Sequence, residues 1–337
     1  MAPCAAIFGP WGAELTDWER GFFAETRPLG FILFARNCNT PDQVRRLTED
    51  LRAAVGHDAL VLIDQEGGRV QRLRPPHWRA WRPPLEDVAK ARDPDRAMAL
   101  RYRIIGHELR ALGIDVNAVP CADLARPETH PFLHNRCYGE TAETVTCIAR
   151  AVARGCLAGG VLPVLKHLPG HGRARADSHL DLARVAAPAA ALEASDFVPF
   201  RALSDLPLGM TAHVVFEGLD QDTPATQAPG MIRLIREDLG FGGLLMTDDI
   251  GMQALSGPVE ARAAAALAAG CDVVLHCNGA RDEIERVARV CEPLTGLAEA
   301  RARAALAARP AAAPVDISTL VAEFECLVGP APGREGR

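Results

Sequence analysis

The sequence predicts an α/β fold, a (β/α)8 TIM barrel that forms a single domain over residues 1–337. Two observations predict it: eight short apolar runs recur along the chain, and segments with helical periodicity separate them. Strands that alternate with helices pair in parallel through right-handed crossovers. Eight such units in 337 residues fit a closed barrel better than a doubly wound sheet, and no GxGxxG motif opens a helix after the first run.

The predicted strands are the apolar runs themselves. They span Ala5–Gly9, Phe31–Phe34, Leu60–Asp64, Ile114–Val119, Leu162–Leu165, Gly209–Val215, Gly243–Thr247 and Val273–His276. Between them, Thr40 is predicted to cap a helix that has Pro41 at its first position, and Asp93 opens another helix in the same way. Further helices are predicted over Thr141–Leu157, Ala191–Leu203, Met231–Leu239 and Pro258–Ala269.

The end of the chain adds no second domain. The residues after Ala280 have a helical pattern rich in alanine and arginine, and they end in a Pro/Gly-rich tail, Gly329–Arg337. The sequence contains no linker of the kind that separates domains and no internal repeat. One domain is therefore expected.

Composition and charge exclude several classes of protein. The net charge is −6 and no basic stripe occurs, so no nucleic-acid partner is expected. The amino-terminal residues do not resemble a signal peptide, and no run approaches the roughly 20 apolar residues of a membrane span. We expect a cytoplasmic protein without membrane contact. The ten cysteines form no CxxC pair, and reduced, mostly buried thiols are expected rather than disulfides or a zinc site.

Ionisable residues gather at the carboxyl ends of the predicted strands. In order along the chain they are Asp64, Asp123, Lys166-His167, His213, Asp248-Asp249 and His276, with Asn278 beside the last. In a (β/α)8 barrel the loops at this end converge on one pocket, so these groups predict a polar active site.

Three motifs carry the chemistry. Asp64 ends an apolar strand, and the paired glycines that follow in DQEGGRVQR allow a sharp turn beside a ligand. The segment KHLPGHG begins a loop rich in glycine and arginine that includes Asp177 and His179. These two side chains leave the same side of an extended backbone, where the carboxylate would favour the protonated imidazole. A surface loop with incidental charges is the alternative interpretation of this segment.

The third motif, MTDDIGM, delivers two adjacent carboxylates, Asp248 and Asp249. Adjacent strand residues point to opposite sides, so one carboxylate is expected to be catalytic and the other supporting. Capping of a helix by Asp249 is compatible with a catalytic Asp248.

In this order and almost residue for residue, the three motifs resemble the bacterial β-N-acetylglucosaminidases of glycoside hydrolase family 3. Weaker similarity, including GFILFARN and Asn135-Arg136-Cys137-Tyr138-Gly139, extends over roughly residues 5–280. Family members have a segment closer to Asp/Glu-Arg-Ser-Phe-Gly at the second of these, so Arg136 is retained while its neighbours differ.

The resemblance implies a role for each matching residue. Asp248 matches the nucleophile, His179 the general acid/base and Asp177 the group that orients His179. The substrate-binding side chains implied for the sugar pocket are Asp64, Arg72, Arg136, Lys166 and His167, with His213 lining the same pocket. No cofactor and no metal ion are implied.

The implied reaction is retaining hydrolysis of a terminal β-linked N-acetylglucosamine, through a covalent glycosyl-enzyme on Asp248. The implied substrate is a small saccharide or muropeptide, a GlcNAc-anhydro-muramic fragment returned from the cell wall, and a monomer is expected. Direct attack by the acetamido group remains open as a route. The alternative functions are another family 3 hexosidase such as a β-glucosidase, a metal-dependent TIM-barrel amidohydrolase, and a non-catalytic sugar-binding protein.

Overall fold

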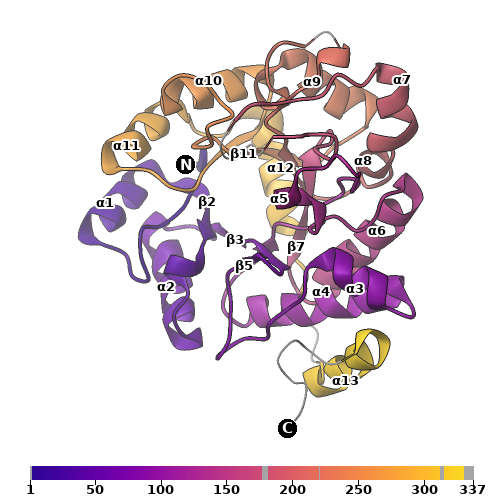
Figure 1. The fold of residues 1–337 in the computed structure, drawn as a ribbon. Coiled ribbons are helices and arrows are strands. Elements are labelled where there is room, and N and C mark those ends of the chain that lie inside the picture. Colours follow the sequence, from indigo (N-terminus) through magenta and orange to yellow (C-terminus); the bar gives the residue numbers. More distant parts are fainter. Residues whose placement is uncertain (1, 177–180, 220, 312–314, 330–337) are drawn as a thin grey trace.

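The computed structural model describes residues 2–176, 181–219, 221–311 and 315–329. Eight parallel strands close into one barrel in the order β1-β12-β11-β9-β7-β6-β3-β2, and helices surround it (Figure 1). The barrel strands are β1 (Cys4–Phe8), β2 (Pro28–Leu33), β3 (Leu60–Ile63), β6 (Val116–Asn117), β7 (Leu162–Leu168), β9 (Leu208–Thr211), β11 (Leu244–Asp249) and β12 (Val273–His276). Each coincides with one of the eight predicted strands, so the predicted fold class is confirmed.

The strand ends differ from the prediction where polar residues continue the pairing. β7 extends to Leu168, which pairs with Thr211, and β11 extends to Asp249, which pairs with Leu275. Lys166-His167 and Asp248-Asp249 therefore lie inside the last residues of their strands, not after them. Apolar character ends before the strand does because these side chains point into a polar pocket.

Two predicted strands are shorter in the barrel than expected. β6 stops at Asn117, since Pro120 has no N–H to donate, although a bridge between Cys121 and Lys166 resumes the pairing. The predicted strand over 209–215 is divided: β9 ends at Thr211, and β10 (Val214–Val215) pairs instead with β8 (Ala183–Arg184). A second small sheet joins β4 (Gln65–Gly67) and β5 (Val70–Gln71).

The outer layer is helical. Its helices are α1 (Asp17–Thr26), α2 (Pro41–Val55), α3 (Pro84–Lys90), α4 (Pro94–Arg110), α5 (Pro131–His134), α6 (Ala142–Ala158), α7 (Ala189–Ala191), α8 (Val198–Ala202), α9 (Pro229–Arg233), α10 (Val259–Ala269), α11 (Arg281–Val290), α12 (Gly296–Ala307) and α13 (Ile317–Val328). Short 3-10 or π turns are η1 (Ala35–Asn37), η2 (Leu192–Asp196), η3 (Glu217–Leu219), η4 (Ala225–Gln227) and η5 (Leu234–Asp238). The predicted caps Thr40 and Asp93 accept the amides of Gln43 and Arg96, as expected.

Two predicted helices are interrupted. The segment 191–203 divides into a π turn and α8, because Pro199 cannot continue the hydrogen bonding of a helix. The segment 231–239 ends in a second π turn, in which the Leu239 amide donates to the Leu234 carbonyl.

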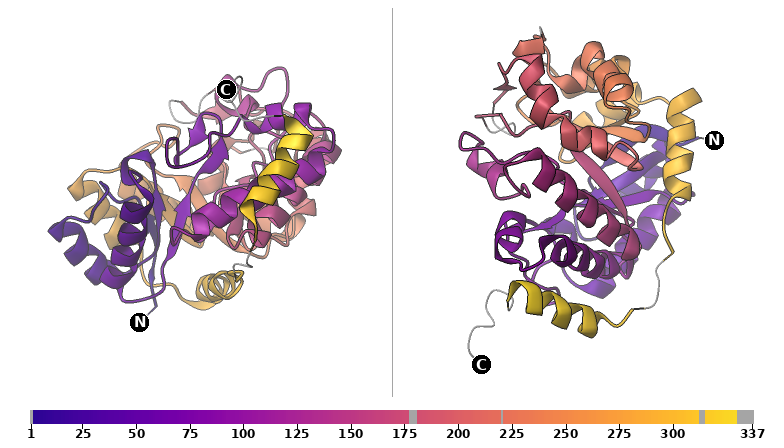
Figure 2. Two further views of the ribbon diagram at one scale, coloured as in Figure 1. Left: turned by 90° about the horizontal axis from the view of Figure 1, so that it is seen from below. Right: turned by 90° about the vertical axis from the view of Figure 1, so that its right-hand side faces the viewer.

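The barrel interior is apolar at one end and polar at the other. Its apolar cluster includes Ile7, Leu62, Met210 and Leu275, and residues of α12 join it from the amino-terminal end of the strands (Figure 2). The Leu294 amide before α12 donates to the Pro3 carbonyl, which holds this helix at the start of β1. With that end closed, the carboxyl ends of the strands form the accessible face.

The barrel strands and their helices span residues 4–307, and α13 packs on α4 beyond them. That the chain forms a single domain stays a prediction, and the predicted tail lies outside the described residues from 330 onward. None of the helices in the described ranges is both long and apolar enough to span a bilayer.

Candidate active site

A cavity of about 250 Å³ opens at the carboxyl ends of the barrel strands. Its wall includes Asp64, Arg72, Arg136, Lys166, His167 and Asp248. Pockets for drug-sized ligands occupy about 300–1,000 Å³, so this cavity suits one sugar ring. Six residues that the sequence assigns to the site are thus brought together from β3, the β5 hairpin, the loop before α6, β7 and β11.

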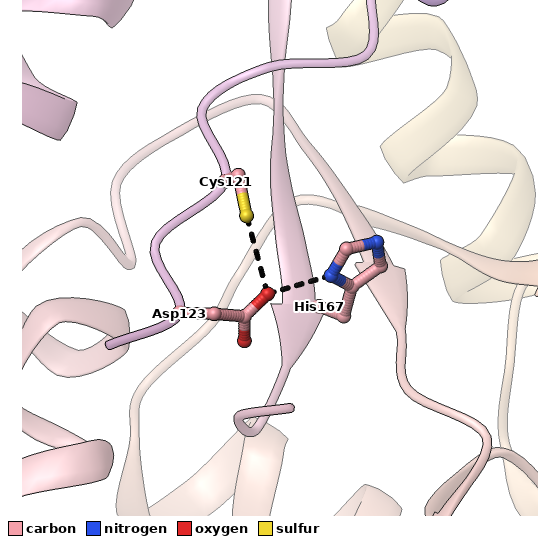
Figure 3. Close-up of side chains that lie close together, drawn as sticks. All are labelled: Cys121, Asp123 and His167. Atoms are coloured by element: carbon pink, nitrogen blue, oxygen red, sulfur yellow. Dashed lines mark hydrogen bonds and ion pairs between the residues drawn. The ribbon is translucent and has the colours of Figure 1, made fainter. Parts of the chain in front are cut away.

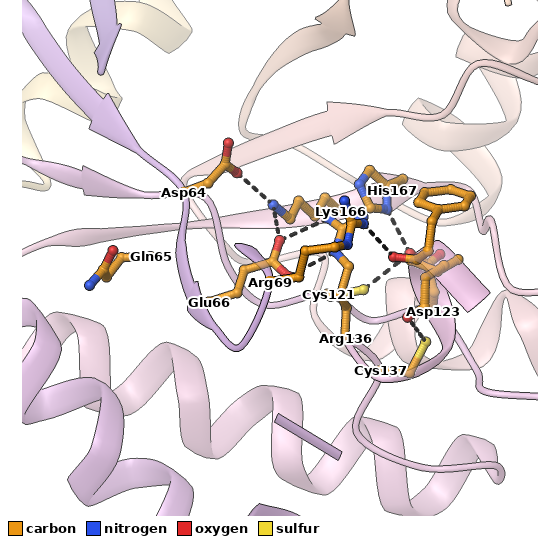
Figure 4. Close-up of polar contacts among 12 residues, drawn as sticks. Asp64, Gln65, Glu66, Arg69, Cys121, Asp123, Arg136, Cys137, Lys166 and His167 are labelled. Atoms are coloured by element: carbon orange, nitrogen blue, oxygen red, sulfur yellow. Dashed lines mark hydrogen bonds and ion pairs between the residues drawn. The ribbon is translucent and has the colours of Figure 1, made fainter. Parts of the chain in front are cut away.

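A network of buried charges forms one wall of the cavity (Figure 4). Lys166 Nζ lies 3.0 Å from Asp64 Oδ1 and 2.7 Å from Glu66 Oε1. Arg136 donates to both carboxylate oxygens of Glu66, each at 2.8 Å. Arg72 donates to Asp64 Oδ2 at 3.2 Å. Three cations and two carboxylates are therefore held in fixed positions, and bidentate Arg–carboxylate pairing fixes orientation as well as distance.

These groups stay charged despite their burial. Burial by itself raises the pKa of Glu66, but Arg136 and Lys166 outweigh it and hold that pKa at about 2. Burial opposes the charge of Asp64 in the same way, yet Lys166 and Arg72 keep the pKa of that carboxyl well below its usual range. Burial would lower the pKa of Lys166, and the two carboxylates raise it instead. A wall of fixed donors and acceptors at neutral pH is what recognition of sugar hydroxyls requires.

His167 is oriented by a carboxylate behind it. Its Nδ1 lies 2.6 Å from Asp123 Oδ2, and the other oxygen of Asp123 accepts the His171 amide at 2.6 Å. Burial opposes ionisation of Asp123, but His167 lowers its pKa to about 2. An ionised carboxylate only accepts hydrogen bonds, so Nδ1 carries a proton, and in the neutral ring Nε2 is then the acceptor. The neighbouring His171 also lines the cavity, and burial lowers its pKa to about 4.

Asp248 and Asp249 both border the cavity but differ in their surroundings. Asp249 Oδ1 accepts the amides of Gly251 and Cys277, at 2.9 and 3.1 Å. Asp248 Oδ1 accepts the amide of Asp249 at 2.8 Å. The bonds of Asp249 tie the end of β11 to the residue after β12, which agrees with a supporting role for it. The two amides that donate to Asp249 lie in a turn and beside β12, not at the start of a helix.

His213 was expected to line the cavity, but it is not among the described residues that form the cavity wall. Its side chain is fully buried between Thr226 and β11. Its Nδ1 lies 2.7 Å from Thr226 Oγ1 and its Nε2 lies 3.0 Å from the Asp249 carbonyl. The reason is the break after β9, which turns residues 212–213 out of the barrel strand. His213 therefore supports the backbone of the two carboxylates.

Asp177 and His179, the expected acid/base pair, lie outside the described residues. The described part of their loop is anchored beside the cavity. The His171 amide is held by Asp123, and Arg173 Nε donates to Asp196 Oδ2 at 2.8 Å.

The sequence places Asp123 among the strand-end residues without a specific role and does not single out Glu66, although both hold the site in place. Glu66 is two residues after Asp64, and a spacing of two on an extended segment places both carboxylates on one side. That spacing was a usable signal. Asp123 gave no local signal beyond its position at a strand end, because its partner His167 is 44 residues away.

The sequence matches the Glycosyl hydrolase family 3 N terminal domain over residues 22–308. It is 39% identical over 280 residues to a β-hexosaminidase of Alkalilimnicola ehrlichii, covering 81% of this chain and 80% of that protein.

Two solved structures share the architecture. A family 3 β-N-acetylglucosaminidase from Paenibacillus sp. FPU-7 superposes with a TM-score of 0.84 at 29% identity, over 95% of this chain and 66% of that one. NagZ from Neisseria gonorrhoeae in complex with N-trifluoroacetyl-D-glucosamine gives a TM-score of 0.79 at 27% identity, over 98% and 99% of the two chains. The chain belongs to glycoside hydrolase family 3 and is a glycoside hydrolase.

Proposed function

We propose that the chain is a retaining exo-β-N-acetylglucosaminidase that removes a terminal, non-reducing N-acetylglucosamine. The observation that carries the proposal is the single-sugar cavity with Asp248 on its wall, opposite a network of fixed charged groups. The names of the relatives support the sugar: β-hexosaminidases in sequence, and a NagZ that holds an N-acylated glucosamine analogue.

In the proposed mechanism Asp64, Arg72, Arg136, Lys166 and His167 hold the hydroxyls of the bound sugar. Asp248 attacks C1 while His179, oriented by Asp177, donates a proton to the glycosidic oxygen, and the leaving group departs with its bond electrons. Neutral His179 then takes a proton from water, whose oxygen attacks C1 and releases Asp248 as a carboxylate. Acid/base assistance of this kind contributes about 10²–10⁴-fold in rate.

We further propose that the natural substrate is a GlcNAc-anhydro-muramic fragment, with or without peptide, in peptidoglycan recycling. A cytoplasmic location and a monomeric state belong to the same proposal.

The test is hydrolysis of an aryl β-N-acetylglucosaminide and of the matching aryl β-glucoside. Wild type is expected to prefer the N-acetylglucosaminide, and Asp248→Asn to be inactive on both. His179→Ala is expected to lose about 10²–10⁴-fold on natural glycosides and much less on an aryl glycoside, whose leaving group needs little protonation. A preference for the glucoside would instead support a β-glucosidase. Equal losses on both leaving groups would exclude His179 as the acid.

A further inference from the structure

Three side chains of metal-binding type meet behind the sugar cavity, and a fourth lies beside them. Cys121, Asp123 and His167 place one ligand atom each within 4.8 Å of one another (Figure 3). Cys121 Sγ lies 3.3 Å from Asp123 Oδ2, which lies 2.6 Å from His167 Nδ1. Cys137, whose Sγ donates to the Leu133 carbonyl at 3.5 Å, also hydrogen-bonds Cys121 and adds a second sulfur.

The residue types and distances fit a zinc site. Zn²⁺ takes four tetrahedral ligands from thiolate, imidazole and carboxylate at about 2.0–2.3 Å, so its ligand atoms lie about 3.3–3.8 Å apart. The separation of Cys121 Sγ from Asp123 Oδ2, 3.3 Å, already falls in that range. The shorter contact between Asp123 and His167 has to open by less than about 1 Å, which a side-chain rotation supplies.

The surroundings isolate these groups from water. Cys121 and Asp123 are each 1% exposed and His167 is 4% exposed, while Cys137 is fully buried. Ala125, Phe132 and Leu133 pack around the two sulfurs. A buried site of this kind shields its ligands from competing water, and the wall of the cavity at His167 is the route of access. Arg136, whose charge acts on Cys121, is already matched by both oxygens of Glu66.

The spacing of the ligands explains why no sequence pattern announces them. Cys121 and Asp123 are two residues apart, but His167 comes 44 residues after Asp123 and Cys137 lies on a separate turn. The sequence predicts no zinc site because the CxxC pair is missing, but that pattern reports only ligands that lie close together in sequence. Here the fourth and fifth strands of the barrel bring the ligands together.

We propose that Cys121, Asp123, His167 and Cys137 form a binding site for a thiophilic divalent cation, with Zn²⁺ as its expected occupant. On binding, the Cys121 and Cys137 thiols release their protons, and His167 presents Nδ1 without a proton, so its remaining proton resides on Nε2. Together with the Asp123 carboxylate, two thiolates leave a net charge of −1 around the dication. Because two protons are released, affinity rises with pH.

Binding changes the face that His167 presents to the sugar. Without the metal ion Nε2 accepts a hydrogen bond from the cavity; with it, the same nitrogen donates one. Asp123, which orients the His167 ring through Nδ1 in the absence of the metal ion, becomes a ligand of the cation instead. Zn²⁺ is therefore an inhibitor of glycoside hydrolysis, a consequence that rests on the proposed function, whereas the binding itself does not.

The binding test uses the full chain with its thiols reduced, titrated with Zn²⁺ by calorimetry and with Co²⁺ by absorbance. Wild type is expected to bind one Zn²⁺ and to show thiolate-to-cobalt charge-transfer absorption. Cys121→Val is expected to weaken Zn²⁺ binding by at least about 100-fold and Cys137→Ser by at least about tenfold. Cys147→Ser and Cys326→Ser, which alter exposed thiols, are the matched controls and are expected to bind as wild type does.

The proposal is overturned if wild type shows no thiolate–cobalt absorption, or if folded Cys121→Val retains wild-type affinity. Circular dichroism and thermal melting establish that each variant is folded, and Cys121→Ser replaces Cys121→Val if the latter is not. In a parallel assay, Zn²⁺ inhibition of aryl N-acetylglucosaminide hydrolysis is expected in wild type and in both controls but not in Cys121→Val. The cobalt absorbance test does not depend on glycosidase activity. The proposed metal site and the proposed function can therefore fail independently of each other.

Discussion

At the scale of single residues, the site depends on buried carboxylates that hold cations and imidazoles in place. Asp123 fixes both the ring of His167 and the start of the loop at His171. Glu66 fixes Arg136 and Lys166. Neither carboxylate needs to touch a sugar to matter, because the groups that line the cavity take their orientation from them.

Replacing Asp123 by Asn tests this positioning. The amide keeps the shape but loses the charge-assisted hydrogen bond to His167, which is worth about 1.5–3 kcal/mol. We expect kcat/KM on an aryl N-acetylglucosaminide to fall about 10- to 150-fold. Asp115→Asn is the control, since this carboxylate is equally buried but pairs with Arg52 and Arg110 at the opposite end of the barrel. An unchanged KM and kcat in Asp123→Asn would show that Asp123 is merely structural.

Glu66→Gln addresses stability. The substitution leaves Arg136 buried without its bidentate partner, and breaking a buried ion pair in this way costs about 3–5 kcal/mol. The free energy of unfolding, measured by urea denaturation, is expected to fall by about that amount. The control is Glu217→Gln, whose partner Arg184 is 51% exposed, where less than about 1 kcal/mol is expected. Equal small losses in both variants would mean that the network contributes no more than a surface pair.

At the scale of elements, the strands and the carboxylates at their ends were predictable, since apolar runs and polar strand ends are local features of sequence. The pairings between them were not, because Arg136 and Glu66 lie 70 residues apart. Helix α1 was missed although Thr16 and Glu19 form a capping box, a local signal that was present. The π turns of η2 and η5 were missed because they leave the apolar pattern almost unchanged.

The crossing of α4 and α6 depends on glycines, and this gives a prediction for the helical layer. A methyl group at Gly155 would lie 2.4 Å from the Ala99 carbonyl oxygen, so the two helices must separate. Gly155→Ala is expected to destabilise the fold by about 1–3 kcal/mol. Gly21→Ala in α1, with nothing within 4 Å, is expected to stabilise it by up to about 1 kcal/mol. Thermal melting of both variants measures the contrast, and a stabilised Gly155→Ala would contradict the packing described here.

At the scale of the whole molecule, the buried carboxylates make the stability of the fold depend on pH in the acid range. The pKa of Glu66 is about 2 against an ordinary 4.5, and that of Asp123 is about 2 against 3.8. The folded state therefore binds these protons more weakly than the unfolded chain. The stability they contribute is complete above about pH 5 and is lost as the pH falls through 4 toward 2.

We expect the melting temperature to change little between about pH 6 and pH 5 on account of these groups, and to fall steeply below about pH 4.5. Differential scanning calorimetry over this range measures it. Glu66→Gln is expected to flatten the acid limb, since one of the groups that must be protonated is gone. An acid limb of the same steepness in that variant would show that other carboxylates dominate.

The barrel as a whole brings Asp248, the proposed nucleophile on β11, to the same cavity as the charged groups from β3 and β7. Covalent attack by Asp248 is the central claim. Its most direct test is incubation with a fluorinated N-acetylglucosaminyl fluoride, which slows hydrolysis of the glycosyl-enzyme, followed by peptide mass spectrometry. The peptide that contains Asp248 is expected to gain the mass of one fluoro-sugar, and Asp248→Asn to gain none. Turnover of the reagent without a labelled peptide, or a label on another residue, would contradict the claim and favour attack by the acetamido group or a different nucleophile.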